Sequence, residues 1–529
     1  MTRTTVSIQT MSVLEPQSLT VSPPDLSELS DGSVFPEVLQ KEEDVDLPRW
    51  RAAVIISAVC LMTLMSTVLS GILAVALPKV AEDIDLEEGL LLWPASVYSL
   101  ACACTLLLFG SLSDVVGAKS NYIAGSFLSA TWILACGLSR TGIQLIIFRA
   151  LHGISISMCL PSSVSIMTAN FKPGPRRNVA FACLGGAQPV GFLIGLVIGG
   201  ILTDLVSWRA CFYIVAGVNA VVLVVSLFYV PKDRRSPGKM LDRFRTEVDW
   251  VGVLVVSTGL ALLSYALASA TADLVAVRSP LVIAFFVLSG FLLLAFPLWM
   301  RGQEKRSRPA LIPNSLWSNP IFLSINMLTF LGWATVTANQ YFLALFFEKV
   351  QLLTAFATSL RFVPLVCSGV LANVATGYLV RRVKANYIIG GTVLVSSGTP
   401  LLMALADPAK PYWTFAFPAT FLSPIAADAV LIIANLAITS IFPAKTHGLA
   451  GGVTNTVAQL GASFGINFTA ILATAVTMNS SIENKTSPHA LLIGYRASFW
   501  MSFGATVAML VIVIFGLRKI GKVGAIKTD

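Results

Sequence analysis

Long apolar runs recur along almost the whole chain, and they restrict its possible folds more than any other feature. Ala53–Pro78, Asp249–Ala268 and Pro280–Met300 are three examples. A helix needs about 20 mainly apolar residues to cross the hydrocarbon core of a bilayer, and many of these runs reach that length. Only 12% of the residues are charged, whereas soluble domains carry about 25%. The sequence therefore predicts an all-α integral membrane protein and argues against a soluble enzyme.

The apolar runs predict fourteen membrane spans separated by short polar loops. Their expected limits are residues 52–78, 90–109, 121–138, 143–168, 179–203, 211–230, 249–269, 280–300, 320–346, 356–380, 387–405, 412–441, 447–476 and 494–517. Residues 1–48 differ sharply, because they are rich in Ser, Thr, Pro and acidic residues and contain too little apolar content to fold alone. We expect them to form a disordered cytoplasmic tail.

The distribution of basic residues predicts the orientation of the spans. Groups of basic residues lie in one set of loops and at the C-terminus: Lys172/Arg176/Arg177, Lys232/Arg234/Arg235/Lys239/Arg243/Arg245, Arg301/Lys305/Arg306/Arg308, Arg381/Arg382/Lys384 and Arg518/Lys519/Lys522/Lys527. The alternate loops carry one each: Lys79, Arg140, Arg209, Arg278, Lys349, Lys410 and Lys485. Because Lys and Arg concentrate in cytoplasmic loops, we expect both termini in the cytoplasm. The plasma membrane is the expected location, with the vacuolar or another internal membrane as the alternative.

Two triplets in the last outward loop fit the acceptor pattern for N-glycosylation. They begin at Asn479 (Asn-Ser-Ser) and at Asn484 (Asn-Lys-Thr). Both lie on the predicted lumenal or extracellular side, where such a modification takes place. They agree with the orientation derived from the basic residues.

Several classes of site are disfavoured by residue spacing. The eight cysteines fall inside apolar spans, and Cys102 and Cys104 lack a second pair at metal-ligand spacing. Gly117-Ala-Lys119-Ser resembles the end of a phosphate-binding loop, but Ala118 stands where that loop requires glycine. The net charge of +9 is that of a membrane protein with basic loops. We therefore expect no metal, no cofactor, no ATP hydrolysis and no nucleic-acid binding.

A segment between the second and third spans carries the most specific motif. Gly110-Ser-Leu-Ser-Asp114-Val-Val-Gly117-Ala-Lys119 resembles the G-x-L-x-D-x-x-G-x-R/K signature of the major facilitator superfamily. Its glycines permit a tight turn and close approach of helices. Asp114 and Lys119 supply charges for a network that can form in one conformation and break in the other. These four residues, Gly110, Asp114, Gly117 and Lys119, are candidates for a conformational gate.

Further segments match the same family in order. Arg149-Ala-Leu-His152-Gly153 resembles its R-x-x-x-G element, with His152 where Gln is usual, and Trp208-Arg209 precedes the sixth span as in drug:proton antiporters. The antiporter signature, in which small residues let helices pack closely, is matched by Gly191, Gly195, Gly199 and Gly200. The resemblance covers about residues 50–517 and points to the fourteen-span drug:proton antiporter branch.

This resemblance implies the domain organisation of the chain. Two six-helix bundles would occupy residues 49–231 and 319–517. Cytoplasmic loops and two additional helices would occupy residues 232–318, and a basic cytoplasmic tail would follow at 518–529.

Three charged or titratable residues inside spans are candidates for proton coupling. A charged group within the hydrocarbon core is costly and is taken as functional by default. Arg149 is at the position to which the family resemblance gives a role in proton coupling, and His152 lies on the same helix face. Asp428 is in the middle of the twelfth span. The alternatives are structural pairing for Arg149, a neutral hydrogen-bonded state for His152 and structural hydrogen bonding for Asp428. Leu69 stands where many antiporters of this branch have an acid.

The ninth span offers candidates for the lining of a substrate cavity. They are Trp333, Asn339, Gln340 and Tyr341. Any of them could instead pack against lipid or a neighbouring helix.

The expected function is secondary active export of small hydrophobic organic compounds, such as drugs, fungicides or toxic metabolites, in exchange for protons. The expected partners are the lipid bilayer, a small-molecule substrate and protons, for a monomeric protein. One alternative is transport of a small polar solute of the ammonium or borate type on the same fold. The alternative of another class is a membrane sensor or receptor that transports nothing.

The orientation can be tested by cysteine accessibility. We expect a cysteine placed at Lys239 to react with a membrane-impermeant maleimide only after permeabilisation, because this loop is basic and faces the cytoplasm. A cysteine placed at Lys485 is the control, and it should react in intact cells. Labelling of position 239 from outside would overturn the orientation.

Overall fold

The structure is a computed structural model that describes residues 48–87, 90–91, 93–171, 175–233, 243, 248–272, 279–306, 308, 311–312, 314–380, 382–441, 447–518 and 520. All regular elements within these ranges are helices. Fourteen of the helical segments are long and apolar enough to cross a membrane. The predicted all-α fold and span count are therefore confirmed. Most of the two predicted tails, 1–48 and 518–529, lies outside the described residues.

The first six spans form one bundle. Its helices are α1 (Arg49–Asp83), α2 (Trp93–Val116), α3 (Ala118–Leu138), α4 (Gly142–Asn170), α5 (Pro175–Leu205) and α6 (Trp208–Tyr229). Helix α1 packs against α5, α2 packs against α4, and α3 packs against α4 and α6. We call the side on which α1 begins the tail side, and the side on which it ends the far side.

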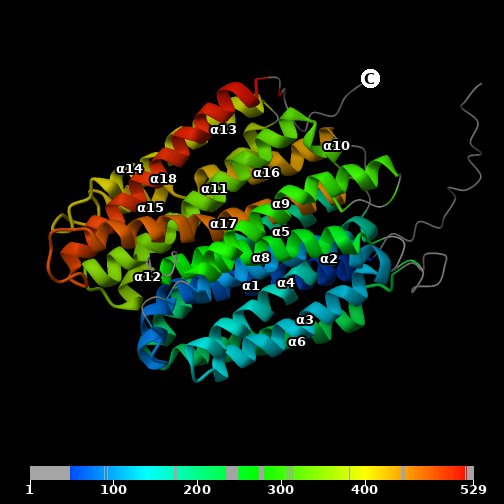
Figure 1. The fold of residues 1–529 in the computed structure, drawn as a ribbon. Coiled ribbons are helices and arrows are strands. Elements are labelled where there is room, and N and C mark those ends of the chain that lie inside the picture. Colours follow the sequence, from blue (N-terminus) through cyan, green and yellow to red (C-terminus); the bar gives the residue numbers. More distant parts are fainter. Residues whose placement is uncertain are drawn as a thin grey trace, which may run out of the picture. The chain divides into compact units, whose positions relative to one another are not determined.

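Two additional helices follow the first bundle, and they lie between the two halves of the chain (Figure 1). Helices α8 (Trp250–Ala272) and α9 (Pro280–Lys305) pack against each other. Helix α8 also contacts α2 of the first bundle and α17 of the second. It therefore covers the line along which the two bundles meet.

The second bundle holds the last six spans. Its elements are α10 (Asn314–Trp317), α11 (Pro320–Leu345), the π-helical turn η5 (Phe346–Val350), α12 (Ala355–Leu379), α13 (Ala385–Ser396), α14 (Gly398–Ala404), α15 (Ala416–Leu422), α16 (Ile425–Ile441), α17 (His447–Met478) and α18 (Pro488–Gly516). Helix α11 packs against α17 as α1 packs against α5. The two bundles meet where α5 contacts α12 and where α2 contacts α17.

The twelfth span differs from its prediction as one continuous segment over residues 412–441. Residues 412–415 form turns, and the helix then breaks between α15 and α16 at Ser423 and Pro424. Proline has no backbone N–H and cannot continue the hydrogen-bond ladder of the preceding helix. The N–H of Asp428 donates to the carbonyl oxygen of Pro424 at 3.1 Å. A helix N-terminus therefore lies in the middle of this span, with Asp428 in its first turn.

Glycines of α5 permit its close approach to α1. A Cβ atom on Gly191 would lie 2.2 Å from the hydroxyl oxygen of Thr67, and one on Gly195 would lie 2.0 Å from the carbonyl oxygen of Val68. A Cβ atom on Gly199 would lie 2.8 Å from an atom of α1, whereas one on Gly200 would lie against α12. Since these distances are far below van der Waals contact, no larger residue fits without moving a helix.

The second bundle repeats this packing with glycines that the sequence analysis did not single out. On α17, a Cβ atom on Gly461 or Gly465 would lie 2.3 Å from a carbonyl oxygen of α11, that of Phe330 or Ala334 respectively. Their spacing of four residues matches that of the α5 glycines, and it is the signal by which they could have been found. Both bundles thus have a pair of helices held at backbone contact.

The close packing of α1 and α5 can be tested with a single methyl group. We expect Gly195→Ala to destabilise the protein by about 1–3 kcal/mol, because the new Cβ overlaps the Val68 carbonyl. The measurement is the thermal midpoint of the purified protein in detergent.

The matched control is Gly217→Ala on α6, where a Cβ atom would meet nothing within 4 Å. It should leave the midpoint unchanged or raise it slightly, since alanine favours a helix. Equal midpoints for the two variants would contradict the packing argument.

Candidate transport cavity

A cavity of about 260 Å³ lies between the two bundles. Helices α1, α2, α4 and α5 line it from the first bundle, and α11, α12, α16 and α17 line it from the second. Of the four residues predicted to line a cavity, Trp333, Gln340 and Tyr341 do so. Asn339 is buried, with 3% of its surface exposed, and it is not part of the lining.

Arg149 lies in the cavity wall on α4 and is 1% exposed. Its Nε donates to the carbonyl oxygen of Pro94 at 3.0 Å, and its Cζ lies 4.8 Å from the ring centroid of Tyr98. Its Nη1 has no acceptor among the described residues. The guanidinium is therefore held by one backbone oxygen and one aromatic ring, and it has no carboxylate partner in the described structure.

Tyr98 connects the two predicted coupling residues of α4, and the sequence analysis missed it. Its hydroxyl shares a hydrogen bond with the hydroxyl of Ser66 on α1. The ring of His152 stacks on that of Tyr98, with centroids 5.2 Å apart and an interplanar angle of 29°. Neither ring nitrogen of His152 has a hydrogen-bond partner among the described residues. Arg149 and His152 thus both contact Tyr98. The sequence signal that could have identified Tyr98 is a tyrosine within an apolar span.

Asp428 lines the cavity from α16 of the second bundle. Its Oδ2 accepts a hydrogen bond from Nδ2 of Asn373 at 3.2 Å, and Nδ2 also donates to the carbonyl oxygen of Gly369. The N-terminus of α16 places a partial positive charge near this carboxyl group. Arg149 and Asp428 therefore face the same cavity from opposite bundles, and the described structure contains no ion pair between them.

The predicted gate motif forms the turn between α2 and α3. Gly117 has a φ of +107°, and a Cβ atom on it would lie 2.3 Å from Oδ2 of Asp233. The backbone N–H of Lys119 donates to both carboxylate oxygens of Asp233, at 3.1 and 3.0 Å. A Cβ atom on Gly110 would lie 3.9 Å from its nearest neighbour, the side chain of Pro161. The side chain of Asp114 lies outside the described residues.

Asp233 was not among the predicted residues, although it lies three positions after the end of the predicted sixth span. Its carboxylate lies at the N-terminus of α3, where free backbone N–H groups and the helix dipole favour a negative charge. The side chain of Lys119 instead donates to the carbonyl oxygens of Leu227 and Val230 at the end of α6. These contacts tie the turn of the gate motif to the end of α6.

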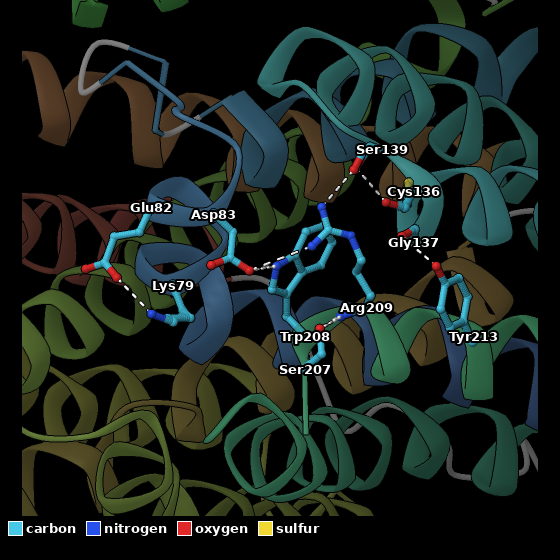
Figure 2. Close-up of polar contacts among 10 residues, drawn as sticks. All are labelled: Lys79, Glu82, Asp83, Cys136, Gly137, Ser139, Ser207, Trp208, Arg209 and Tyr213. Atoms are coloured by element: carbon cyan, nitrogen blue, oxygen red, sulfur yellow. Dashed lines mark hydrogen bonds and ion pairs between the residues drawn. The ribbon is translucent and has the colours of Figure 1, made fainter. Parts of the chain in front are cut away.

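A polar cluster joins three helices of the first bundle on the far side (Figure 2). Nε1 of Trp208 donates to Oδ2 of Asp83 at 2.8 Å, and Nη1 of Arg209 lies 3.7 Å from the same oxygen. Nη2 of Arg209 donates to the carbonyl oxygen of Ser139 at 3.1 Å. The ends of α1, α3 and α6 are thereby connected through the Trp208-Arg209 pair that the sequence analysis singled out.

The predicted glycosylation sites lie on the same side as this cluster. Asn479 and Asn484 are both exposed in the segment between α17 and α18. Oδ1 of Asn484 accepts hydrogen bonds from the backbone N–H and the hydroxyl of Thr486, the third residue of its triplet. Their accessibility is compatible with the predicted modification, which stays a prediction.

Comparison with known protein families identifies the family of this chain. Residues 59–466 match the family model described as Major Facilitator Superfamily. The chain belongs to the major facilitator superfamily. The resemblance drawn from the sequence motifs is thus confirmed, and the protein is a membrane transporter, not an enzyme.

Known facilitators align with this chain along most of its length. "MFS-type transporter 1" from Pyricularia oryzae is 39% identical over 528 residues, which cover 91% of this chain and 86% of the relative. The low affinity ammonium transporter of Saccharomyces cerevisiae is 26% identical, with 79% of each chain covered. The efflux pump terJ of Aspergillus terreus is 24% identical, covering 89% of this chain and 90% of the pump.

Solved facilitator structures share the fold. A bacterial homologue of the human lysosomal transporter Spinster, in an inward-facing and unoccupied conformation, has a TM-score of 0.61 at 13% identity. The alignment covers 90% of this chain and 98% of that protein.

The two facilitator bundles are in contact on the far side of the cavity. Oδ2 of Asp204, near the end of α5, accepts a hydrogen bond from the backbone N–H of Phe356 on α12 at 3.0 Å. An apolar cluster includes Leu196 of the first bundle with Phe342 and Phe362 of the second. These contacts close the bundles against each other on that side.

The turn of the gate motif generates a prediction about transport. We expect Gly117→Leu to abolish transport, because a side chain there is strained at φ +107° and overlaps Asp233. The variant should still reach the membrane, since the cavity and the bundle cores are untouched. Transport is measured in a strain without its own exporters, with the amount of protein determined by a fluorescent fusion.

The matched control is Gly290→Leu on α9, where a Cβ atom would meet nothing within 4 Å. It should transport like the parent protein. Normal transport by Gly117→Leu would show that the turn has no role in the transport cycle.

Proposed function

We propose that this facilitator is a secondary active exporter of small hydrophobic organic compounds that exchanges them for protons. The observation that carries the proposal is the placement of Asp428 in the wall of a cavity that also contains Trp333 and Tyr341. Aromatic and apolar walls suit an apolar substrate. A buried carboxyl group that gains and loses a proton provides the link to a proton gradient.

The surroundings of Asp428 support a role in proton exchange. Asn373 donates one hydrogen bond to the carboxyl group, and no cationic side chain of the described residues pairs with it. Without an ion pair to hold it in the charged form, the group is free to change its protonation when the cavity fills or empties. The relatives include the efflux pump terJ, whose name agrees with export.

We further propose that the tail side faces the cytoplasm and that the protein works as a monomer in the plasma membrane. The basic loops support the orientation. In this arrangement the cavity takes up compounds from the cytoplasmic side or the inner leaflet and releases them on the far side.

A second candidate function is transport of a small polar solute of the ammonium type. It is favoured by the relationship to the ammonium transporter of Saccharomyces cerevisiae and by Leu69, which stands where many antiporters have an acid. The aliphatic side chains of the cavity argue against it, because a small hydrated cation gains little from an apolar wall.

Coupling to protons can be tested with a protonophore. We expect export to collapse when the pH gradient is dissipated while ATP is held constant, because the chain has no nucleotide-binding motif. The measurement is efflux of a fluorescent, uncharged hydrophobic compound from cells without their own exporters. Unchanged efflux in the protonophore would exclude proton antiport.

The role of Asp428 is tested by two substitutions. We expect Asp428→Asn to reduce export at least about tenfold, because the amide cannot exchange a proton, and Asp428→Glu to retain more activity since it keeps a titratable group. Asp407→Asn, in the turn between α14 and α15, is the matched control and should export normally. Normal export by Asp428→Asn would mean that another residue couples export to protons.

A further inference from the structure

Two residues that line the cavity carry buried hydrogen-bond donors without an acceptor among the described residues, and these donors define the kind of substrate that completes the site. We propose that the facilitator binds small aromatic organic anions, with the anionic oxygen of a carboxylate or an ionised hydroxyl group hydrogen-bonded to Arg149. This inference rests on the proposed export function and specifies its substrate class.

Arg149 is the main support for this proposal. The titratable groups near its guanidinium are Cys136, Tyr98 and His152, and none of these residue types carries a negative charge at pH 7. A buried cation without a negative partner is costly, and an arginine presents a planar set of donors that matches a carboxylate. Pro94 supplies one neutral acceptor, which leaves Nη1 without an acceptor among the described residues. A bound anion would provide the missing partner.

A second hydrogen-bond donor of the cavity lining also lacks an acceptor in the described structure. Nε1 of Trp333 on α11 is buried and has no acceptor within the described part of the chain. Among the lining residues, the buried polar side-chain atoms without partners are these two, and both are donors. The carboxyl oxygen Oδ2 of Asp428 already accepts from Asn373. The site therefore requires acceptors from its ligand more than donors.

The dimensions and walls of the cavity define the rest of the ligand. A volume of about 260 Å³ is small for a ligand site and suits a compound with one or two rings. Tyr341, Trp333 and Phe192 provide apolar and aromatic surface for such a ring. A flat aromatic body that carries one anionic group satisfies both the walls and the donors.

The same charge distribution discriminates against cations. With Asp428 protonated, the guanidinium of Arg149 is the one charge among the lining residues, and it repels a cationic ligand strongly where water is excluded. A neutral compound such as an amide can offer an acceptor oxygen but no charge to offset that of the guanidinium. We therefore expect affinity to fall in the order anion, neutral compound, cation.

The test compares four ligands that share one ring system. The purified full-length protein in lipid nanodiscs is titrated calorimetrically with 2-naphthoate, 2-naphthalenesulfonate, 2-naphthamide and 2-naphthylmethylamine. We expect both anions to bind at least about tenfold more tightly than the amide, the effect of one charge-assisted hydrogen bond. The amine should bind most weakly. The sulfonate is included because it stays ionised at every accessible pH.

Substitutions identify the residue responsible. Arg149→Gln should remove the preference for anions while leaving the affinity for 2-naphthamide within about twofold, which also shows that the cavity is intact. Arg149→Lys should retain part of the preference because it keeps the charge. Arg496→Gln is the matched control, since this arginine of α18 donates to the carbonyl oxygen of Ala406 outside the cavity. It should keep the full preference.

Equal affinities for the four ligands, tightest binding of the amine, or an anion preference that persists in Arg149→Gln would each overturn the proposal. Absence of binding by all four ligands would overturn it as well. If Arg149→Gln does not fold, the order of the four ligands on the parent protein decides. The efflux assay with an uncharged compound is independent of this titration, so that failure of the anion proposal is distinguishable from failure of the export proposal.

Discussion

Backbone hydrogen bonding in an environment without water is the constraint on which the rest of this structure depends. Within a bilayer every buried N–H and C=O group must find a partner in the protein, and helices provide it within each segment. Once all spans are helical, lipid does not drive them together as water would, and close contact becomes the main source of attraction. Gly191, Gly195 and Gly199 on α5, with Gly461 and Gly465 on α17, supply that contact by removing side chains where backbones meet. The cavity between the bundles is positioned by these two tightly packed pairs.

The chemistry of the protein is concentrated where the regular pattern is interrupted. Pro424 breaks the twelfth span and puts Asp428 at the start of a half-helix in the middle of the membrane. Arg149 occupies the facing wall with one neutral acceptor and one aromatic ring. One bundle thus contributes a permanent positive charge and the other a titratable carboxyl group. Movement of the bundles relative to each other would change the electrostatic environment of whatever lies between them.

Much of this arrangement could be predicted from sequence because it depends on local patterns. Apolar runs of sufficient length predicted the fourteen spans, and glycine spacing predicted the surface of α5 that packs closely. Charges within apolar runs identified Arg149 and Asp428. Contacts between distant segments were not predictable, because no local pattern relates the residues that meet. Three hydrogen-bonded contacts are of this long-range type: Tyr98 with Ser66, Asn373 with Asp428, and Asp233 with Lys119. Asn339 shows the converse, since a polar residue next to lining residues can face away from the cavity.

The far-side contact between the bundles has a consequence for how this facilitator can change over time. Asp204 receives its hydrogen bond from the backbone N–H of Phe356, and Gly200 would meet the backbone carbonyl oxygen of Ala355 at 3.0 Å. Main-chain atoms are the same whatever amino acid occupies the position, apart from proline, which lacks the N–H group. The start of α12 can therefore accumulate side-chain changes without losing this hydrogen bond. A transporter built in this way can diversify the far-side surface of its bundles while the backbone contact that closes them is inherited intact.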